Sequence, residues 1–161
     1  MTPKSKSMRL ADCRLLLPLL LGAAIAAGCA DSGRSAALPL IEPARLARLL
    51  KTPGARRPLL IQVGFRELFD IAHVPGSERI GPAEEPEALG RLKARVAPLP
   101  RDSFVVIYCG CCPWSRCPNV RPAAAALRGM GFKNAWILDL PRFFGTDWAD
   151  KGYPTTRGRR A

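Results

Sequence analysis

The sequence predicts an α/β fold in which a central, mostly parallel sheet is flanked by helices. Three short apolar runs have the length and composition of buried strands, and stretches with helical periodicity lie between them. This alternation of strands and helices is typical of a parallel sheet. The chain has 161 residues, of which 48% are hydrophobic, so it is long enough for one domain with a substantial core.

The predicted elements follow one another without an internal repeat. A first helix is expected over residues 43–51, because Pro43 suits a first helical turn and three leucines then share one face. The sequence further predicts strands at 59–63, 104–108 and 135–138, and helices at 66–71, 84–96 and 119–130. Gly131 suits the end of the last helix. Ligands of such sheets bind beyond the carboxyl ends of the strands, so a site is expected after residue 108.

The first thirty residues have the pattern of an export signal. Four basic residues precede an uncharged run over 15–30, which is shorter than the roughly 20 residues that a membrane span needs. The run contains an Ala-Ala-Gly-Cys motif that ends at Cys29 and resembles a bacterial lipobox. By that resemblance, residues 1–28 are removed as a lipoprotein signal peptide and the Cys29 thiol receives a diacylglycerol. An ordinary signal peptide cleaved after Ala26 or Ala30 is the alternative.

Downstream of the signal, the sequence predicts three parts. These are a membrane tether over 29–41, a folded domain over 42–154 and a basic tail over 155–161. By resemblance to bacterial lipoproteins, the protein would face the periplasm from the cell envelope, and alanine rather than aspartate at position 30 favours the outer membrane. The net charge of +12 is scattered along the chain without a basic stripe interleaved with aromatic residues, so no nucleic-acid partner is expected.

Four of the six cysteines lie in one predicted loop, at Cys109, Cys111, Cys112 and Cys117. In the oxidising compartment that an exported protein enters, cysteines usually form disulfides that connect distant parts of a fold. These four are too close in sequence to do so, which favours local chemistry. The loop also lies between a predicted strand and a predicted helix, where backbone N–H groups and the helix dipole stabilise a thiolate.

Five segments, in the right order, resemble the rhodanese-like domain, a sulfurtransferase family. They are the strand at 59–63, the loop Ala72-His73-Val74-Pro75-Gly76-Ser77, the strand ending at Cys109, the turn Gly131-Phe132-Lys133-Asn134-Ala135, and Trp148 with Gly152-Tyr153-Pro154. The resemblance covers about residues 42–154 and implies a rhodanese-like fold. The loop itself resembles an exported subgroup with the motif Cys-Gly-Cys-Cys-Pro-Trp. One departure is that the family's usual Asp-Val-Arg after the first core strand reads Gln62-Val63-Gly64 here.

The resemblance implies a thiosulfate-type sulfurtransferase that needs no cofactor. A thiolate would attack the outer sulfur of a small sulfane donor, hold that sulfur as a persulfide and pass it to a thiol acceptor. The family's placement of the nucleophile at a strand end favours Cys109. Its spacing, with a basic residue five positions after the cysteine, favours Cys111 because Arg116 then follows at the right distance. Of the two, Cys109 is the expected nucleophile because of its position at the strand end.

Other residues of the loop are candidates for supporting roles. Cys112 is a third candidate nucleophile. Gly110 would let the loop curl so that backbone N–H groups face the sulfur. Arg116 or Arg121 could bind the anionic end of the donor.

Further kinds of function remain open. Four thiols can supply two to four soft ligands to Cu(I) or Zn(II), although their spacing is not typical of zinc sites. Cys112 and Cys117 could instead form a reversible redox disulfide, since the adjacent Cys111 and Cys112 would pair only with strain. A rhodanese fold without turnover is the last alternative. Cell-cycle dual-specificity phosphatases share the rhodanese-like fold and have an arginine six positions after the cysteine. No arginine lies at that distance from Cys109, Cys111 or Cys112, so phosphatase activity is not expected.

Overall fold

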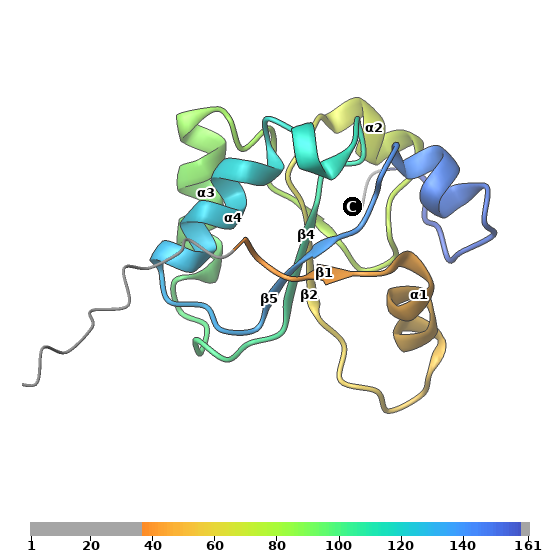
Figure 1. Cartoon of the computed structure of the whole chain (residues 1–161), viewed down its shortest axis with the longest axis horizontal. Helices are drawn as coiled ribbons and strands as arrows, with labels where there is room; N and C mark the ends of the chain where they lie inside the picture. The colour runs from red at the N-terminus through yellow and green to blue at the C-terminus, as the bar shows by residue number, and fades with distance from the viewer. Residues whose placement is uncertain (1–36, 159–161) are drawn as a thin grey trace, which may run out of the picture. The chain divides into compact units, whose positions relative to one another are not determined.

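The fold consists of a five-stranded, all-parallel sheet with helices on both faces (Figure 1). The computed structural model describes residues 37–158, so the predicted signal peptide, the lipidation site and most of the tether lie outside the described residues. The strands are β1 (Leu40–Ile41), β2 (Leu59–Gln62), β3 (Glu78–Arg79), β4 (Val105–Tyr108) and β5 (Ala135–Leu138), in the order β1-β5-β4-β2-β3. The predicted fold class is therefore confirmed.

The helices alternate with these strands along the chain. They are α1 (Pro43–Lys51), α2 (Arg66–Ile71), α3 (Pro86–Val96) and α4 (Val120–Gly129), with a 3-10 turn η1 (Trp114–Arg116) and a π-helical turn η2 (Gly145–Ala149). The predicted helices at 43–51 and 66–71 have these bounds in the structure, whereas those at 84–96 and 119–130 are one or two residues shorter at their ends.

Strand β4 lies at the centre of the sheet and positions the cysteine loop. It pairs with β2 on one side and with β5 on the other, and all four of its residues are buried. Its β-branched residues suit a pleated strand that is covered on both faces. The pairing of Gln62 with Tyr108 brings the carboxyl ends of β2 and β4 to the same level. The residues after β4 therefore lie where parallel sheets carry their sites.

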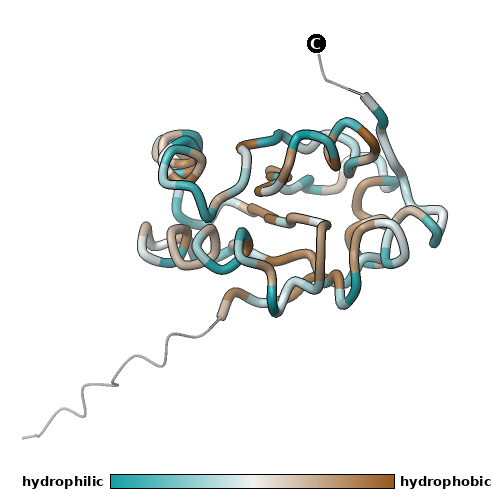
Figure 2. The backbone as a smooth tube through the Cα atoms, turned by 90° about the horizontal axis from the view of Figure 1, so that it is seen from above, coloured by the Kyte–Doolittle hydropathy of each residue, from teal (hydrophilic) through white to brown (hydrophobic). Residues whose placement is uncertain are grey.

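Alternate residues of β4 point into two separate hydrophobic layers. Val105 and Ile107 pack with α3 and α4, whereas Val106 and Tyr108 pack with α1 and the segment around Trp148. In Figure 2 the hydrophobic strands run between these outer layers. Because side chains alternate along an extended chain, the next residue, Cys109, points toward α3 and α4, and it is buried in that layer.

Helix α4 ends at Gly129, one residue before the predicted end, and Gly131 terminates it. Gly131 has a φ of +83°, its N–H donates to the carbonyl of Arg128, and the N–H of Phe132 donates to the carbonyl of Leu127. This pair of hydrogen bonds is the Schellman arrangement, which favours glycine at the left-handed position. The cap terminates α4, whose first turn is attached to the cysteine loop by the hydrogen bond from Arg121 to the Ser115 carbonyl.

The structure contains two short strands and a contact of the tail that the sequence does not predict. Strands β1 and β3 have two residues each, and β1 uses Leu40 and Ile41 from the predicted tether. The tail residue Thr156 exchanges two backbone hydrogen bonds with His73, each of 2.9 Å. His73 itself is buried, stacks on Phe69 at 3.7 Å and shares a hydrogen bond of 2.7 Å between its Nδ1 and the Phe69 carbonyl. The first residues of the tail are thus attached to the fold.

Within residues 37–158, no helix is both long enough and apolar enough to cross a membrane.

Candidate active site

The four loop cysteines lie together as free thiols at the carboxyl end of β4, and we call them the thiol cluster: Cys109, Cys111, Cys112 and Cys117. The Sγ of Cys111 lies 3.2 Å from that of Cys109 and 3.2 Å from that of Cys112. The Sγ atoms of Cys109, Cys111 and Cys117 all lie within 4.8 Å of one another. The structure thus brings together the cysteines that the sequence singles out.

The members of the thiol cluster differ in their access to solvent. Cys109 is 3% exposed and Cys117 is 0% exposed, whereas Cys111 and Cys112 are half-buried. A reagent from solution therefore meets Cys111 or Cys112 first. Cys111 is the one of these two that contacts the buried Cys109 thiol.

The thiols of Cys109 and Cys117 interact so that Cys117 carries the negative charge. The hydrogen bond from Cys109 lowers the pKa of Cys117 despite its burial, and the backbone N–H groups of Val120 and Asn119 lower this pKa further. The same contact with Cys117, together with burial, raises the pKa of Cys109. The first proton to leave the pair is therefore the one on Cys117, at the first turn of α4.

Cys112 behaves differently from Cys117. Burial, followed by hydrogen bonds with its neighbours in the thiol cluster, raises the pKa of Cys112 to about 12. Its thiol is therefore protonated at neutral pH.

Asn119 connects the thiol cluster to a second loop. This buried side chain directs its Nδ2 toward the Cys109 sulfur at 3.6 Å, and its Oδ1 accepts a hydrogen bond of 3.2 Å from the Glu84 N–H. This role of Asn119 is not visible in the sequence. Asn119 directly precedes α4, a position where an asparagine often caps a helix, yet its side chain forms no capping bond here.

Gly64 and Gln62 surround Cys109 from the β2 side. Gln62 donates from its Nε2 to the Cys109 carbonyl at 3.2 Å and accepts the Gly64 N–H at 3.2 Å, and it is buried. A Cβ atom on Gly64 would lie 2.7 Å from the Cys109 sulfur and 2.9 Å from the Gln62 Nε2. The departure from the family's Asp-Val-Arg therefore leaves room for the thiol where a side chain would otherwise lie.

The Gly64→Ala substitution tests this close contact. We expect it to lower the free energy of unfolding by about 1–3 kcal/mol, because the new methyl group overlaps the Cys109 sulfur and the neighbourhood must shift. Denaturant unfolding measures the change. The control is Gly90→Ala, inside α3, where a Cβ meets no heavy atom within 4 Å and is expected to stabilise the helix by up to about 1 kcal/mol. Equal stability of the two variants would contradict the proposed overlap.

Gly110 and Phe144 shape the opposite side of the loop. Gly110 has a φ of +91°, which favours glycine, and a Cβ there would lie 2.9 Å from the Phe144 Cβ. The Phe144 N–H donates to the Gly110 carbonyl at 3.0 Å. The aromatic segment before η2 thus holds the chain directly after Cys109.

The two candidate donor-binding arginines lie near the thiol cluster but differ in their contacts. Arg121, in the first turn of α4, donates from its Nη2 to the carbonyl of Ser115 at 2.9 Å and so fixes η1 against the helix. Arg116 is exposed within η1 itself. Binding of an anionic donor by either residue stays a prediction.

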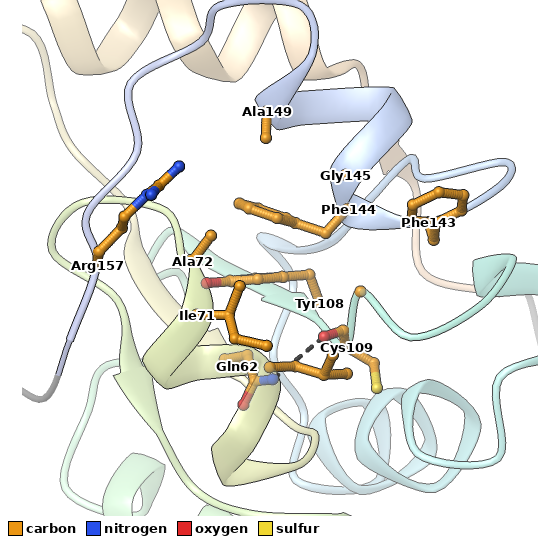
Figure 3. Close-up of a pocket in the computed structure, with 12 residues that line it drawn as sticks. Gln62, Ile71, Ala72, Tyr108, Cys109, Phe143, Phe144, Gly145, Ala149 and Arg157 are labelled. Carbon is orange, nitrogen blue, oxygen red and sulfur yellow. Dashed lines mark hydrogen bonds between the residues drawn. The ribbon is translucent and has the colours of Figure 1, made fainter.

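An apolar cavity of about 290 Å³ lies on the other side of Cys109. Its walls include Ile71, Tyr108, Phe144 and, at one side, Arg157. Figure 3 shows that the Cys109 sulfur points away from this cavity, while its carbonyl is held by Gln62. Cys109 and Gly110 therefore line the cavity, but the Cys109 sulfur lies outside it.

Comparison with known families identifies the class of protein. Residues 42–140 match the family described as the Rhodanese-like domain. This match spans more than half of the sequence, and the fold and the cysteine after the central strand agree with it. The chain belongs to the rhodanese-like domain family.

Solved structures share this fold at low sequence identity. The rhodanese-like domain of the Anabaena protein Alr3790 is 18% identical with a TM-score of 0.55, and the match covers 74% of this chain and 79% of that one. BH2092 from Bacillus halodurans is also 18% identical, with a TM-score of 0.55 and coverage of 74% and 77%. The Saccharomyces cerevisiae single-domain sulfurtransferase RDL2 is 22% identical, with a TM-score of 0.52 and coverage of 74% and 95%. The comparison with curated proteins gave no match.

Proposed function

We propose that this protein transfers or carries sulfane sulfur as a cysteine persulfide on the thiol cluster, and that the sulfur enters at Cys111. One observation carries the proposal: the half-buried Cys111 sulfur lies 3.2 Å from the buried Cys109 sulfur at the end of β4. A thiol that a small donor can reach thus contacts the cysteine at the position of the family's nucleophile. Family membership adds support, since a solved relative of this fold is described as a sulfurtransferase.

The proposed reaction has two sulfur-transfer steps. The Cys111 thiolate attacks the outer sulfur of thiosulfate, a sulfur–sulfur bond forms on the protein, and the bond to the inner sulfur breaks to release sulfite with its electron pair. An acceptor thiolate then attacks the outer sulfur of the persulfide and carries it away, which returns the Cys111 thiolate. No net oxidant or reductant is consumed. Arg116 and the loop N–H groups are the proposed contacts for the anionic donor.

The experiment uses a full-length chain with Cys13 and Cys29 changed to serine, so that all remaining thiols belong to the thiol cluster. After reduction and incubation with thiosulfate, we expect the loop peptide to gain the mass of one sulfur atom and the solution to contain an equal amount of sulfite. Mass spectrometry of the alkylated peptides and a sulfite assay measure both. A chain that neither gains sulfur nor releases sulfite, with thiosulfate or with an organic persulfide donor, would refute the proposal.

We further propose that the protein is an exported lipoprotein, anchored through Cys29 to the outer membrane and facing the periplasm. The basic start, the short uncharged run and the motif that ends at Cys29 support this location. A lipid anchor would hold the domain at the membrane surface, where small sulfur donors and thiol acceptors are its partners.

The Cys29→Ser substitution tests the anchor. In bacterial cells we expect the wild-type chain to partition into the detergent phase, and the variant to lose this partitioning because it lacks the thiol that carries the diacylglycerol. Phase separation with a mild detergent, followed by mass measurement of the N-terminal peptide, checks the result. The Cys13→Ser variant is the control, since Cys13 lies within the signal that would be removed. An unlipidated wild-type chain would contradict the prediction.

A further inference from the structure

We propose that Cys109, Cys111 and Cys117 form a binding site for one Cu(I) ion, which we call the three-thiol site. This site is a separate property of the loop and does not depend on sulfur transfer. It rests on the convergence of three sulfur atoms from different parts of the fold. Cys109 follows the central strand, Cys111 belongs to the loop, and Cys117 precedes α4.

The spacing of the three sulfurs suits a common metal ion. A metal about 2.3 Å from each of three thiolates in a plane needs sulfur–sulfur separations of about 4 Å. The three Sγ atoms lie within 4.8 Å of one another, and the Sγ atoms of Cys109 and Cys111 are 3.2 Å apart. Small rotations of the side chains would therefore bring all three to bonding distance.

The chemistry of the donor set favours Cu(I). The three-thiol site offers sulfur alone, and soft thiolate ligands select Cu(I), Zn(II) or iron–sulfur clusters. Structural zinc is almost always four-coordinate. The fourth cysteine, Cys112, contacts Cys111, but its sulfur is not among the three that all lie within 4.8 Å of one another. Three ligands without a fourth fit a monovalent, soft ion better than Zn(II).

The surroundings compensate the charge that three thiolates would bring. Asn119 directs its Nδ2 toward the Cys109 sulfur, and backbone N–H groups at the first turn of α4 face the Cys117 sulfur. Two of the three ligands are buried, which protects a bound Cu(I) ion from solvent oxidants. Hydrogen bonds to coordinating sulfurs of this kind are typical outer-shell features of metal sites.

The fold, rather than the local sequence, assembles the three-thiol site. Cys117 is eight positions from Cys109, and η1 with its Arg121 contact brings it back beside the end of β4. A short peptide with the same cysteines lacks this constraint. Binding by the folded chain should therefore be much stronger than binding by the peptide. Bound Cu(I) would also occupy the thiol that is proposed to accept sulfur.

The experiment titrates Cu(I) without oxygen into the reduced full-length chain that carries Cys13→Ser and Cys29→Ser, in competition with a coloured Cu(I) chelator. We expect one tightly bound Cu(I) per chain. Cys109→Ser, Cys111→Ser and Cys117→Ser should each lower the affinity on the order of 100-fold or more, because outer-shell changes alone cost 10–100-fold. Cys112→Ser, the matched control, should keep the affinity within about threefold.

Three outcomes would overturn the proposal. They are wild-type affinity in any of the three ligand variants, a greater loss in Cys112→Ser than in those variants, and equal affinity of a synthetic peptide spanning residues 107–119. X-ray absorption on the loaded chain without loop substitutions gives an independent answer that does not require the variants to fold. Three sulfur neighbours around copper would support the site, and two or four would overturn it.

Discussion

Replacing Cys111 with serine is expected to lower the rate of sulfite release from thiosulfate by at least about a thousandfold. Serine is nearly the same size, so the loop should fold, but its hydroxyl is a far weaker nucleophile and cannot hold a persulfide. The reason for choosing Cys111 is its position, because it is half-buried and contacts the buried Cys109. Single-turnover assays of sulfite, with mass measurement of the loop peptide, check the result.

Three further variants make the Cys111 result interpretable. Ser115→Ala changes an exposed residue of the same loop and is expected to leave the rate unchanged within about twofold. Cys109→Ser and Cys112→Ser test the other candidate nucleophiles. If Cys111→Ser still forms a persulfide and either Cys109→Ser or Cys112→Ser does not, the sulfur enters at the cysteine replaced in that inactive variant. The prediction for Cys111 is then wrong.

Truncation of Trp148 to alanine is expected to lower the free energy of unfolding by about 3–5 kcal/mol. Trp148 is 0% exposed, donates from its Nε1 to the Pro154 carbonyl at 2.8 Å and packs against Phe144 and Tyr153. Because Phe144 holds the chain at Gly110, the loss should also loosen the active loop. Denaturant unfolding measures the stability, and the rate of Cys109 alkylation measures the loosening.

Trp136→Ala is the matched control for this prediction. Trp136 is only half-buried, donates to the Asn134 Oδ1 and lies beneath the Arg45 guanidinium. Its truncation is expected to lower the free energy of unfolding by about 1–2 kcal/mol, because less buried apolar surface is lost than at Trp148. The active loop should be unchanged. Similar losses of stability in the two variants would contradict the central role assigned to Trp148.

The main strands and helices could be predicted from the sequence because their apolar patterns are strong. The run ending at Tyr108 has four buried residues in succession, and Gly131 marks the end of α4 by its need for a positive φ. Strands β1 and β3 were not predicted because two residues carry no periodicity. The pairing of Thr156 with His73 was missed for another reason, since it depends on contacts between residues that are far apart in sequence.

The candidate site could be predicted in kind but not in detail. The sequence indicates a cluster of cysteines after a strand, and the structure brings them together. The sequence does not indicate that Cys109 and Cys117 are buried while Cys111 is accessible, because the path of the loop decides this. The contribution of Gly64 is also invisible in sequence, since its importance lies in an atom that is absent beside a sulfur 45 positions later.

The burial of Cys109 and Cys117 has a consequence for handling the protein in the laboratory. Both sulfurs lie in the layer between the sheet and α4, so a bulky alkylating reagent reaches them when this layer opens. The rate at which Cys109 and Cys117 are labelled therefore reports how often the layer between the sheet and α4 opens.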